Sequence, residues 1–462
     1  MLHGPPSTIL EDVEIDIFSF SDIESLRREC HVTYNIGLLP LLEKALLGYP
    51  VRALSFSAVE TRSLNVRKSV SWKEELTQCF PAFRQHCTVT MQLPACKSCS
   101  GNRHGRQYSR SSAAGKTGHD GPVHALAFSS DGQLVATASA DSTIILWDAH
   151  SACISQEYFA HNGDVNDLAF SPDGQYLASA GRDGKVEIWD IIQDARRLTT
   201  LAAHGGNYPI VACAWFPDGT HIAYRTSDSV THLCDAHTFQ HLRILDPTHM
   251  GYEHAKHISV SPDSRWIAGR SEGGYGVWDI ASGVFYPLED TDKASEDTAT
   301  SRAIFDKESM RLALGYMDGS IRVWDIETAR ELLFLVAHVN VVRDMAFSPD
   351  GRMLLSASQD RMVKIWDAHT GDVLASLEGH EDWVLAACFS PCGRYVASAS
   401  DDTTVKLWRM SDGSCLRTLR EHDGPVTHVA FSCDGAMLWS AARDGTVCVR
   451  RLVDVVLNPT LS

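Results

Sequence analysis

The sequence predicts an all-β protein made of repeated small antiparallel sheets. Two observations lead to this prediction: the dipeptide Trp-Asp recurs along the chain, and a turn phrase of the type Ala-Phe-Ser-Pro-Asp-Gly stands upstream of most copies. The dipeptides lie at 147–148, 189–190, 278–279, 324–325 and 366–367, with the variant Trp-Arg at 408–409. A fixed internal period of this kind indicates a repeat architecture.

The distances inside the repeats are constant. In five repeats a histidine precedes an aspartate by 22 residues, and in four of these a tryptophan follows the aspartate by six. The five pairs are His119–Asp141, His161–Asp183, His338–Asp360, His380–Asp402 and His422–Asp444. Neighbouring histidines are 42 residues apart in the regular parts of the array. Counting the motifs predicts eight repeats.

Each repeat contains the residues of a four-stranded sheet. In the first one, β-rich runs at 123–128, 134–138 and 144–147 are separated by Asp, Gly and Ser turns, and a looser run follows at 153–159. Four strands in a unit of this length are typical of a β-propeller blade. We therefore predict an eight-bladed propeller over residues 118–462.

These motifs resemble those of the WD-repeat family over residues 118–452. The resemblance implies a buried, hydrogen-bonded tetrad of His, Ser or Thr, Asp and Trp in each regular blade. The implied tetrads are His119, Thr137, Asp141 and Trp147 in blade one; His161, Ser179, Asp183 and Trp189 in blade two; His338, Ser356, Asp360 and Trp366 in blade six; and His380, Ser398, Asp402 and Trp408 in blade seven.

A repeated set of His, Ser and Asp also suggests a hydrolytic triad. A triad needs one exposed nucleophile in a cleft, whereas a set that recurs blade by blade with an indole N–H satisfies buried polar groups. We therefore interpret the tetrads as structural, and predict no catalytic residue, cofactor or metal. An enzyme on a propeller scaffold is the lowest-ranked alternative.

Several repeats depart from the pattern. At the hydroxyl position, repeats three to five carry Tyr224, Ala268 and Leu314. The third repeat replaces the tryptophan by Cys234, and the eighth replaces it by Arg450. Two explanations stay open. Loss of the motif residues is tolerated in these blades because apolar contacts alone hold them together, or the altered blades form a specialised face.

Closure of the ring requires an outer strand for the last blade, because a bare sheet edge is a liability. The residues just before Gly118 make a poor strand. Segments 12–18 and 87–93 alternate apolar and polar residues and are better candidates, and the C-terminal tail 457–461 is a third.

The chain before the propeller divides into two parts. Residues 1–96 form an extension of uncertain, mixed fold, and residues 97–117 are a flexible basic linker without acidic residues. Cys96 and Cys99 have the spacing of half a zinc site, and Cys79, His86, Cys87 and His104 lie nearby in the sequence. A lone Cys-x-x-Cys without a second paired half is a weak signal, so zinc binding stays an open alternative. The Gly-Lys-Thr at 115–117 resembles the end of a phosphate-binding loop, but no apolar strand precedes it.

Composition limits the classes of partner. A net charge of −17 argues against sequence-independent nucleic-acid binding, which needs many phosphate-neutralising Lys and Arg residues. The densest apolar run, residues 36–47, is too short and interrupted to cross a bilayer, and no signal peptide is visible. Thirteen scattered cysteines indicate reduced thiols, so we expect a cytoplasmic or nuclear protein without a membrane span.

The sequence thus predicts a non-catalytic scaffold that assembles other proteins or peptides on the propeller faces. By the family resemblance, partner-facing positions lie at the start of the inner strand and just before the tetrad aspartate. The candidate contacts are Arg182, Arg343, Gln359, Trp383, Leu385, Asp401 and Arg443, with His124 and Asn166. Trp383 stands out because Trp and Arg are favoured binding anchors, although packing against a neighbouring blade would also explain it.

Two further functions stay open. One is the substrate receptor of a cullin-RING ubiquitin ligase, a role implied by resemblance to some WD-repeat proteins. Their ligase-linker motif has a basic residue two positions after the Asp of Trp-Asp, and none of the five equivalent residues here is Arg or Lys: His150, Ile192, Ala281, Glu327 and His369. The other is a corepressor-like or signalling platform, which rests on fold analogy alone.

Overall fold

The computed structural model describes most of the chain beyond residue 116 and four short strands before it. The described ranges are 117–192, 196–202, 208–245, 258–271, 274–288 and 300–457. The chain divides into two compact units, Met1–Ser109 and Arg110–Ser462. Cys96 and Cys99 lie outside the described residues.

In the first unit the described elements are two pairs of two-residue strands. β1 (Val13–Glu14) pairs antiparallel with β3 (Ser55–Phe56). β2 (Thr33–Tyr34) pairs parallel with β4 (Thr88–Val89).

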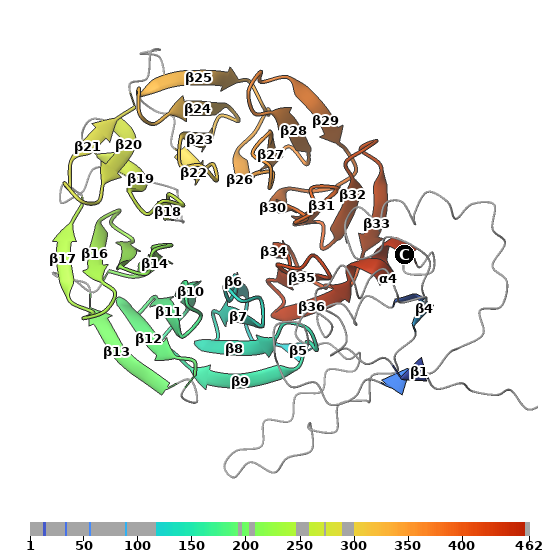
Figure 1. Ribbon diagram of the computed structural model, residues 1–462, viewed down its shortest axis with the longest axis horizontal. Coiled ribbons are helices and arrows are strands. Elements are labelled where there is room, and N and C mark those ends of the chain that lie inside the picture. The colour runs from blue at the N-terminus through green and yellow to red at the C-terminus, as the bar shows by residue number, and fades with distance from the viewer. Residues whose placement is uncertain are drawn as a thin grey trace, which may run out of the picture. The chain divides into compact units, whose positions relative to one another are not determined.

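The second unit is a ring of eight four-stranded antiparallel sheets, which confirms the predicted all-β, eight-bladed propeller (Figure 1). Blade 1 comprises β6 (Val123–Phe128), β7 (Leu134–Ser139), β8 (Thr143–Asp148) and β9 (Ile154–Phe159); blade 2, β10 (Val165–Phe170), β11 (Tyr176–Gly181), β12 (Lys185–Asp190) and β13 (Arg196–Ala202); blade 3, β14 (Ile210–Trp215), β15 (His221–Thr226), β16 (Thr231–Asp235) and β17 (His241–Ile244); blade 4, β18 (Ser259–Val260), β19 (Trp266–Ser271), β20 (Gly274–Asp279) and β21 (Phe285–Pro287).

The second half of the ring repeats this order from the centre to the rim (Figure 1). Blade 5 comprises β22 (Thr300–Phe305), β23 (Arg311–Tyr316), β24 (Ile321–Asp325) and β25 (Arg330–Leu335); blade 6, β26 (Val342–Phe347), β27 (Met353–Ser358), β28 (Val363–Asp367) and β29 (Val373–Leu377); blade 7, β30 (Val384–Phe389), β31 (Tyr395–Ser400), β32 (Val405–Arg409) and β33 (Cys415–Leu419); blade 8, β34 (Val426–Phe431), β35 (Met437–Ala442), β36 (Thr446–Arg451) and β5 (Thr117–Gly118). A short helix, α4 (Leu452–Leu457), follows β36.

The Ser-Pro-Asp-Gly phrases form the turns between the first two strands of a blade. In blade 2, Gly174 has a φ of +70°, a left-handed conformation that glycine adopts without steric cost. The Ser171 hydroxyl donates to the Asp173 carboxylate at 2.5 Å, and the same carboxylate accepts the backbone N–H of Gln175 at 3.0 Å. The side chains therefore satisfy the polar groups of the turn and set the register of β10 against β11.

The core of the ring lies between blades. In blade 1, Val135 and Ile145 pack against blade 8, while their chain neighbours Ala136 and Ile144 pack against blade 2. Successive side chains of a strand point to opposite faces, and both faces of a blade are covered, so the inner strands have nearly continuous apolar sequences.

Blades 3 to 5 form complete sheets despite their altered motifs. In blade 3, Tyr224 stacks on His232 with ring centroids 4.8 Å apart, and Cys234 is buried in the place of the tryptophan. In blade 5, Trp324 is buried, and its indole N–H has no hydrogen-bond partner among the described residues because Leu314 occupies the hydroxyl position. Apolar and aromatic packing is therefore sufficient to hold these sheets.

Polar side chains of the inner strands bind the next blade. Asp167 in blade 2 accepts the backbone N–H of Cys213 in blade 3 at 3.0 Å. Thr427 in blade 8 donates to the carbonyl oxygen of Val123 in blade 1 at 3.1 Å. Asn166, a candidate partner contact, likewise donates to a blade 3 carbonyl at 2.7 Å, so its amide links two blades.

The closing strand is not one of the three favoured segments, and that prediction was wrong. β5 pairs antiparallel with β36, with Gly118 opposite Thr446 and Thr117 opposite Val447. Segments 12–18 and 87–93 contain β1 and β4, which pair within the first unit; Leu457 ends α4, and residues 458–461 lie outside the described part of the chain. A rim strand buries little surface, as β9 shows, so apolar alternation is not required of it.

Glycine makes the short closing pair possible. Gly445 has a φ of +83°, and a Cβ on it would overlap the carbonyl oxygen of His119. A Cβ on Gly118 would overlap the carbonyl oxygen of Gly445. The backbones therefore approach closely enough for the His119 N–H to donate to Gly445 at 2.8 Å.

Trp439 at the closing junction is expected to stabilise the whole ring. It is fully buried between blades 8 and 1, edge-on to Phe128 and Trp147 with centroids 6.2 Å apart in both pairs. Trp439→Ala should lower the free energy of unfolding by about 3–5 kcal/mol, measured by urea denaturation. Trp439→Phe should cost less, because it keeps a ring and removes an indole N–H that has no partner among the described residues.

The matched control is Trp383→Ala, because Trp383 is 41% exposed. It should change the free energy of unfolding by less than about 1 kcal/mol. Equal losses in Trp439→Ala and Trp383→Ala would contradict a stabilising role for the junction.

Candidate functional site

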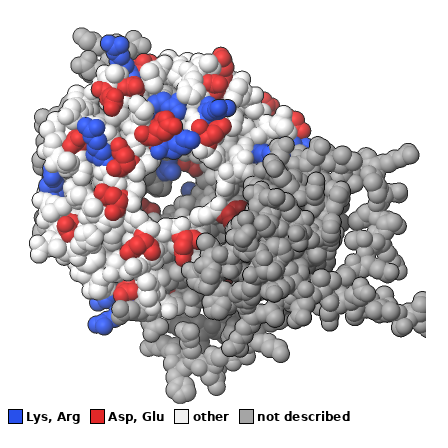
Figure 2. Space-filling model, in the orientation of Figure 1, with Lys and Arg blue, Asp and Glu red and all other residues white. Residues whose placement is uncertain are grey.

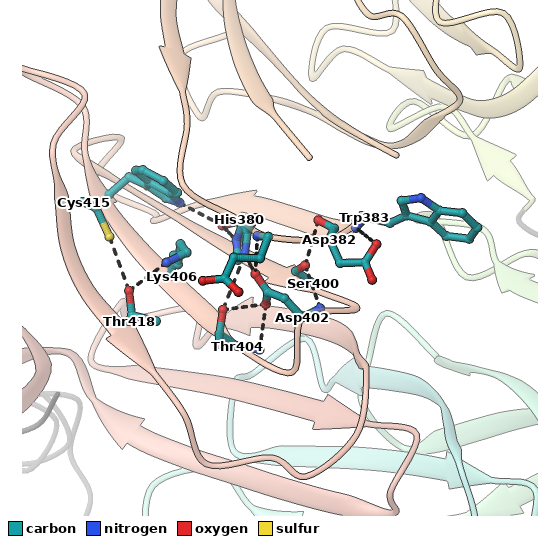
Figure 3. Close-up of polar contacts among 12 residues, drawn as sticks. His380, Asp382, Trp383, Ser400, Asp402, Thr404, Lys406, Cys415 and Thr418 are labelled. Carbon is teal, nitrogen blue, oxygen red and sulfur yellow. Dashed lines mark hydrogen bonds and ion pairs between the residues drawn. The ribbon is translucent and has the colours of Figure 1, made fainter. Parts of the chain in front are cut away.

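In blade 7 the implied tetrad forms a chain of hydrogen bonds across the sheet. Figure 3 shows the His380 and Asp402 end of this chain. His380 Nδ1 lies 2.8 Å from Asp402 Oδ2, and its Nε2 lies 2.7 Å from Ser398 Oγ. The Trp408 indole N–H donates to the same Oγ at 2.8 Å. With the proton on Nδ1, a tautomer assigned from this network, the imidazole donates to the carboxylate and accepts from the serine.

Blades 2, 6 and 1 repeat this chain. The distances are His161–Asp183 2.9 Å, His161–Ser179 2.8 Å and Trp189–Ser179 3.0 Å in blade 2; His338–Asp360 2.8 Å, His338–Ser356 2.8 Å and Trp366–Ser356 2.9 Å in blade 6; and His119–Thr137 2.8 Å and Trp147–Thr137 2.9 Å in blade 1. In blade 1 the His119 Nδ1 reaches Thr143 Oγ1 at 2.9 Å and lies 3.4 Å from Asp141. In all four blades, the structure therefore brings together the residues assigned to each tetrad from the sequence.

Blade 8 has an incomplete network. His422 Nε2 lies 2.7 Å from Ser440 Oγ, and its Nδ1 lies 2.5 Å from Thr446 Oγ1. Arg450, which stands in the place of the tryptophan, donates to Glu421 at 2.7 Å. The rim side of this blade therefore carries an ion pair where the regular blades carry an indole.

The tetrad hydroxyls are poorly placed for nucleophilic chemistry. Ser179, Ser356 and Ser398 are fully buried, and each is already bound by an imidazole and an indole. A nucleophile must reach a substrate carbonyl, so this geometry fits the satisfaction of buried polar groups. Within the described ranges, no group of three or more His, Cys, Asp or Glu residues is arranged to hold a metal ion. No helix in the described part of the chain has the length and apolar character needed to cross a membrane.

Five candidate contact residues lie together where blades 6, 7 and 8 meet. We call Arg343, Gln359, Trp383, Asp401 and Arg443 the blade 6–8 cluster. The Arg343 guanidinium carbon lies 6.0 Å from the centroid of the Trp383 ring. Arg343 also interacts electrostatically with Asp401 and Arg443. The cluster therefore joins three consecutive blades.

The repeat itself places three of these residues at equivalent positions. The backbone N–H of Asp401 donates to the carbonyl oxygen of Trp383 at 2.8 Å. Gln359 makes the same bond to Val341 at 3.0 Å, and Arg443 makes it to Pro425 at 2.8 Å. Gln359, Asp401 and Arg443 thus each follow the last residue of the second strand of their blade. At this point the backbone lies beside the start of the inner strand.

Gln359 has a different role from the one expected. It is buried, and with its amide oxygen turned toward Arg343 it accepts from Nε at 2.9 Å and also from Nη2. Its amide nitrogen then donates to Asn340 Oδ1 at 3.2 Å. Gln359 therefore holds Arg343 in place instead of offering a free surface.

The other candidate contacts are separate from the cluster. Arg182 in blade 2 is exposed and forms an ion pair with Asp164 at 3.3 Å. Leu385 is half-buried in β30, and His124 is half-buried in β6.

Val339 is an exposed apolar residue that the sequence interpretation missed. Its side chain is 92% exposed, and it precedes Asn340, whose side chain contacts Gln359. The equivalent positions after the tetrad histidines of the other four repeats are polar: Asp120, Asn162, Glu381 and Asp423. A valine where the other repeats have polar residues was the sequence signal that could have identified this position.

Burial and neighbouring charges shift the pKa values within the cluster. Burial raises the pKa of Asp401, and the nearby guanidiniums of Arg443 and Arg343 oppose this effect. Burial also lowers the pKa of Arg343, with repulsion from Arg443 acting in the same direction and attraction to Asp401 against it. One carboxylate therefore lies near two guanidiniums that repel each other.

On a wider scale, Figure 2 shows one face of the ring with basic and acidic side chains interspersed around a central hollow. The part of this face that the figure colours carries no large field of a single sign. In Figure 3 the Trp383 indole points away from the His380 network.

The closed ring with its repeated tetrads defines a β-propeller of repeat type. Five of its segments match the family model described as WD domain, G-beta repeat: residues 113–148, 152–190, 330–367, 371–409 and 413–450. These five segments are therefore WD repeats, and they form part of the closed eight-bladed ring.

The curated relatives match over limited segments. A mouse protein named WD repeat and SOCS box-containing protein 1 is 38% identical over 84 residues, 18% of this chain and 20% of that protein. The Takifugu rubripes protein of the same name is 30% identical over 162 residues, 31% of this chain and 36% of that protein. The Arabidopsis thaliana WD repeat-containing protein VIP3 is 29% identical over 33% of this chain and 50% of its own length. The chain thus spans a fifth to a half of these relatives.

A solved structure matches over a larger share of the chain. The crystal structure of the computationally designed Ika8 protein has a TM-score of 0.61 and 28% identity, covering 72% of this chain and 98% of that one. This similarity supports the propeller fold.

Asp141 is expected to make the stability of blade 1 depend on acid pH. Burial alone would raise its pKa, but the hydrogen bonds from His119 and Thr143 outweigh burial and lower the pKa from 3.8 to about 2. Because folding lowers this pKa, the ionised carboxylate stabilises the fold above pH 3.8, and this contribution is lost as the pH falls through about 2.

Asp141→Asn should therefore be less stable than the wild type by about 2 kcal/mol at pH 7, a difference that shrinks as the pH falls. Urea denaturation at several pH values between 7 and 2 measures it. Thr137→Val removes hydroxyl contacts without removing the titrating group, so its deficit should not depend on pH. A deficit of Asp141→Asn that stays constant down to pH 2 would contradict the assignment.

Proposed function

We propose that this protein is a non-catalytic scaffold that binds partner proteins through the face carrying the blade 6–8 cluster. The observation that carries the proposal is an exposed tryptophan of blade 7 with an arginine of blade 6 beside its ring. Trp383 is 41% exposed and has Arg343 beside its ring. Trp and Arg are the residues most enriched among those that dominate binding energy.

The surroundings of the cluster support this role. Propellers of the WD-repeat type typically bind other proteins. Two of the three blades that carry the cluster, blades 6 and 7, have complete tetrads, so their buried His, Ser and Trp side chains are hydrogen-bonded. Rigid presentation reduces the conformational entropy lost on binding.

The proposed partners are proteins or peptides rather than nucleic acid or membrane, in line with the net charge of −17. We also propose a cytoplasmic or nuclear location. The cysteines in the described ranges, such as Cys213 and Cys388, are free thiols, which is usual in a reducing compartment.

Substitution of the cluster should remove partners without unfolding the protein. In affinity purification of the full chain, Trp383→Ala and Arg443→Ala should reduce bound partner proteins about tenfold or more. Arg182→Ala is the matched control, because Arg182 has the position of Arg443 in another blade and an acidic neighbour of its own. If both cluster variants keep the full partner set and native circular dichroism, the proposed face is wrong.

A second candidate is the substrate receptor of a cullin-RING ubiquitin ligase. It is favoured by the local similarity to proteins whose printed names include a SOCS box. Under this function, cullin-ligase subunits should co-purify with the wild type, and they should persist in Trp383→Ala while the substrate is lost. Purification of partners in stoichiometric amounts without any ligase subunit would favour the scaffold alone.

A further inference from the structure

The blade 6–8 cluster has more positive charge than its own acid neutralises. Arg443 is exposed, and its guanidinium makes no hydrogen bond or close ion pair with any described residue. Arg343 uses Nε and Nη2 on the neutral amide of Gln359. The Asp401 carboxylate interacts electrostatically with both, and its Oδ1 is enclosed without a hydrogen-bond partner in the described ranges. Two guanidiniums therefore face solvent with one partly enclosed carboxylate.

An anionic group placed between Arg343 and Arg443 would relieve their mutual repulsion. Guanidinium binds carboxylate and phosphate through paired N–H donors, and such charge-assisted bonds are about twice as strong as neutral ones. No described residue binds Nη1 of Arg343 or the Arg443 guanidinium, so within the described part of the chain these donors are left for an anion. The chemistry of the pair therefore selects an anion.

Apolar surface lies beside Arg343, whose guanidinium is next to the Trp383 ring. Trp383 is 41% exposed and Val339 is 92% exposed, and both stand in loops that lead into inner strands of neighbouring blades, β30 and β26. A partner that covers them gains the free energy of removing apolar area from water. The partner should thus carry an apolar side chain next to its anionic one.

Two further acids limit how much negative charge the partner can have. Glu381 and Asp382 are exposed in the loop that leads to Trp383. Asp382 accepts the Trp383 backbone N–H at 2.8 Å, which fixes its carboxylate in the same loop. With a net charge of −17, the protein as a whole repels a strongly acidic chain. A single anionic group fits, whereas a run of acids does not.

We infer that the blade 6–8 cluster binds a linear peptide segment with one anionic side chain, a carboxylate or a phosphate, adjacent to an apolar residue. This inference rests on the proposed function, since it specifies the partner for the same face. Arg343 and Arg443 bind the anion, and Trp383 with Val339 contacts the apolar residue.

The test measures how substitutions that remove or reverse the charge of the cluster change binding to a defined set of peptides. The probe is a set of twelve-residue peptides with Glu, phosphoserine, Ser, Gln or Lys at the centre, next to Leu or Gly in otherwise neutral sequence, and a second set with four consecutive Glu residues. The full chain is used as wild type, Arg443→Gln, Arg443→Glu, Trp383→Ala and the control Arg182→Glu. Circular dichroism and urea denaturation confirm that each variant folds.

The wild type is expected to prefer Glu-Leu and phosphoserine-Leu peptides over Gln-Leu, Ser-Leu and four-Glu peptides by about tenfold. Preference for Glu or for phosphoserine identifies the source of the anion. Arg443→Gln should lose the preference, Arg443→Glu should turn it toward Lys-Leu, and Arg182→Glu should keep it. Raising the salt concentration should weaken binding of the anionic peptides most.

The outcomes separate this inference from the proposed function. If Trp383→Ala loses protein partners in affinity purification but the wild type binds neutral or Lys-centred peptides best, the anionic partner is wrong and the face stands. If Arg443→Glu keeps the preference for Glu-Leu or phosphoserine-Leu, the arginine pair is not the anion site and the inference falls. If neither Trp383→Ala nor Arg443→Ala loses a protein partner in affinity purification, the proposed function is wrong, and the inference that rests on it is wrong as well.

Discussion

The sheets of this propeller have apolar residues on both faces, and each sheet is stable only when neighbours cover both. Val135 and Ile145 face blade 8 while Ala136 and Ile144 face blade 2, so removal of either neighbour exposes half of the core of blade 1. The ring must therefore close, and the junction between blades 8 and 1 bears this requirement. Trp439 fills the junction, Thr427 donates across it, and the two residues of β5 pair with the last strand. An open array would leave two such faces in water.

Polar groups within the blades are satisfied in two ways. Regular blades use the tetrad, in which one buried hydroxyl is bound by both an imidazole and an indole, as Ser398 is by His380 and Trp408. Blade 3 replaces this chain with stacked rings of Tyr224 and His232. The cost of an unpaired buried N–H is a few kcal/mol at most, so a blade tolerates the orphan indole of Trp324 when its faces are well packed. The eight blades therefore share one four-stranded architecture although their sequence motifs differ.

The candidate site depends on the same rigidity. Residues just before the tetrad aspartate leave the sheet at one repeated position, so substitutions there change the chemistry of the surface without changing the fold. Blades 6 to 8 carry Gln359, Asp401 and Arg443 at this position, whereas blade 2 carries Arg182, which is paired with its own Asp164. Consecutive blades therefore present different residues at structurally equivalent positions.

The repeat period alone was enough to predict the propeller and its blade number, because both depend on short, regular spacings within one blade. The resemblance to the WD-repeat family implied the tetrads and the partner-facing positions, and the latter stay a prediction. Neither the period nor the resemblance predicted that Gln359 is buried and hydrogen-bonded to Arg343, that Val339 is exposed in the loop before β26, or that Thr117 and Gly118 close the ring. Only the tertiary structure decided these points. The burial of Gln359 and the exposure of Val339 depend on packing between loops, which the residue type at a single repeat position does not determine. The closing pair joins residues more than 300 positions apart and has almost no apolar residues by which the sequence could reveal it.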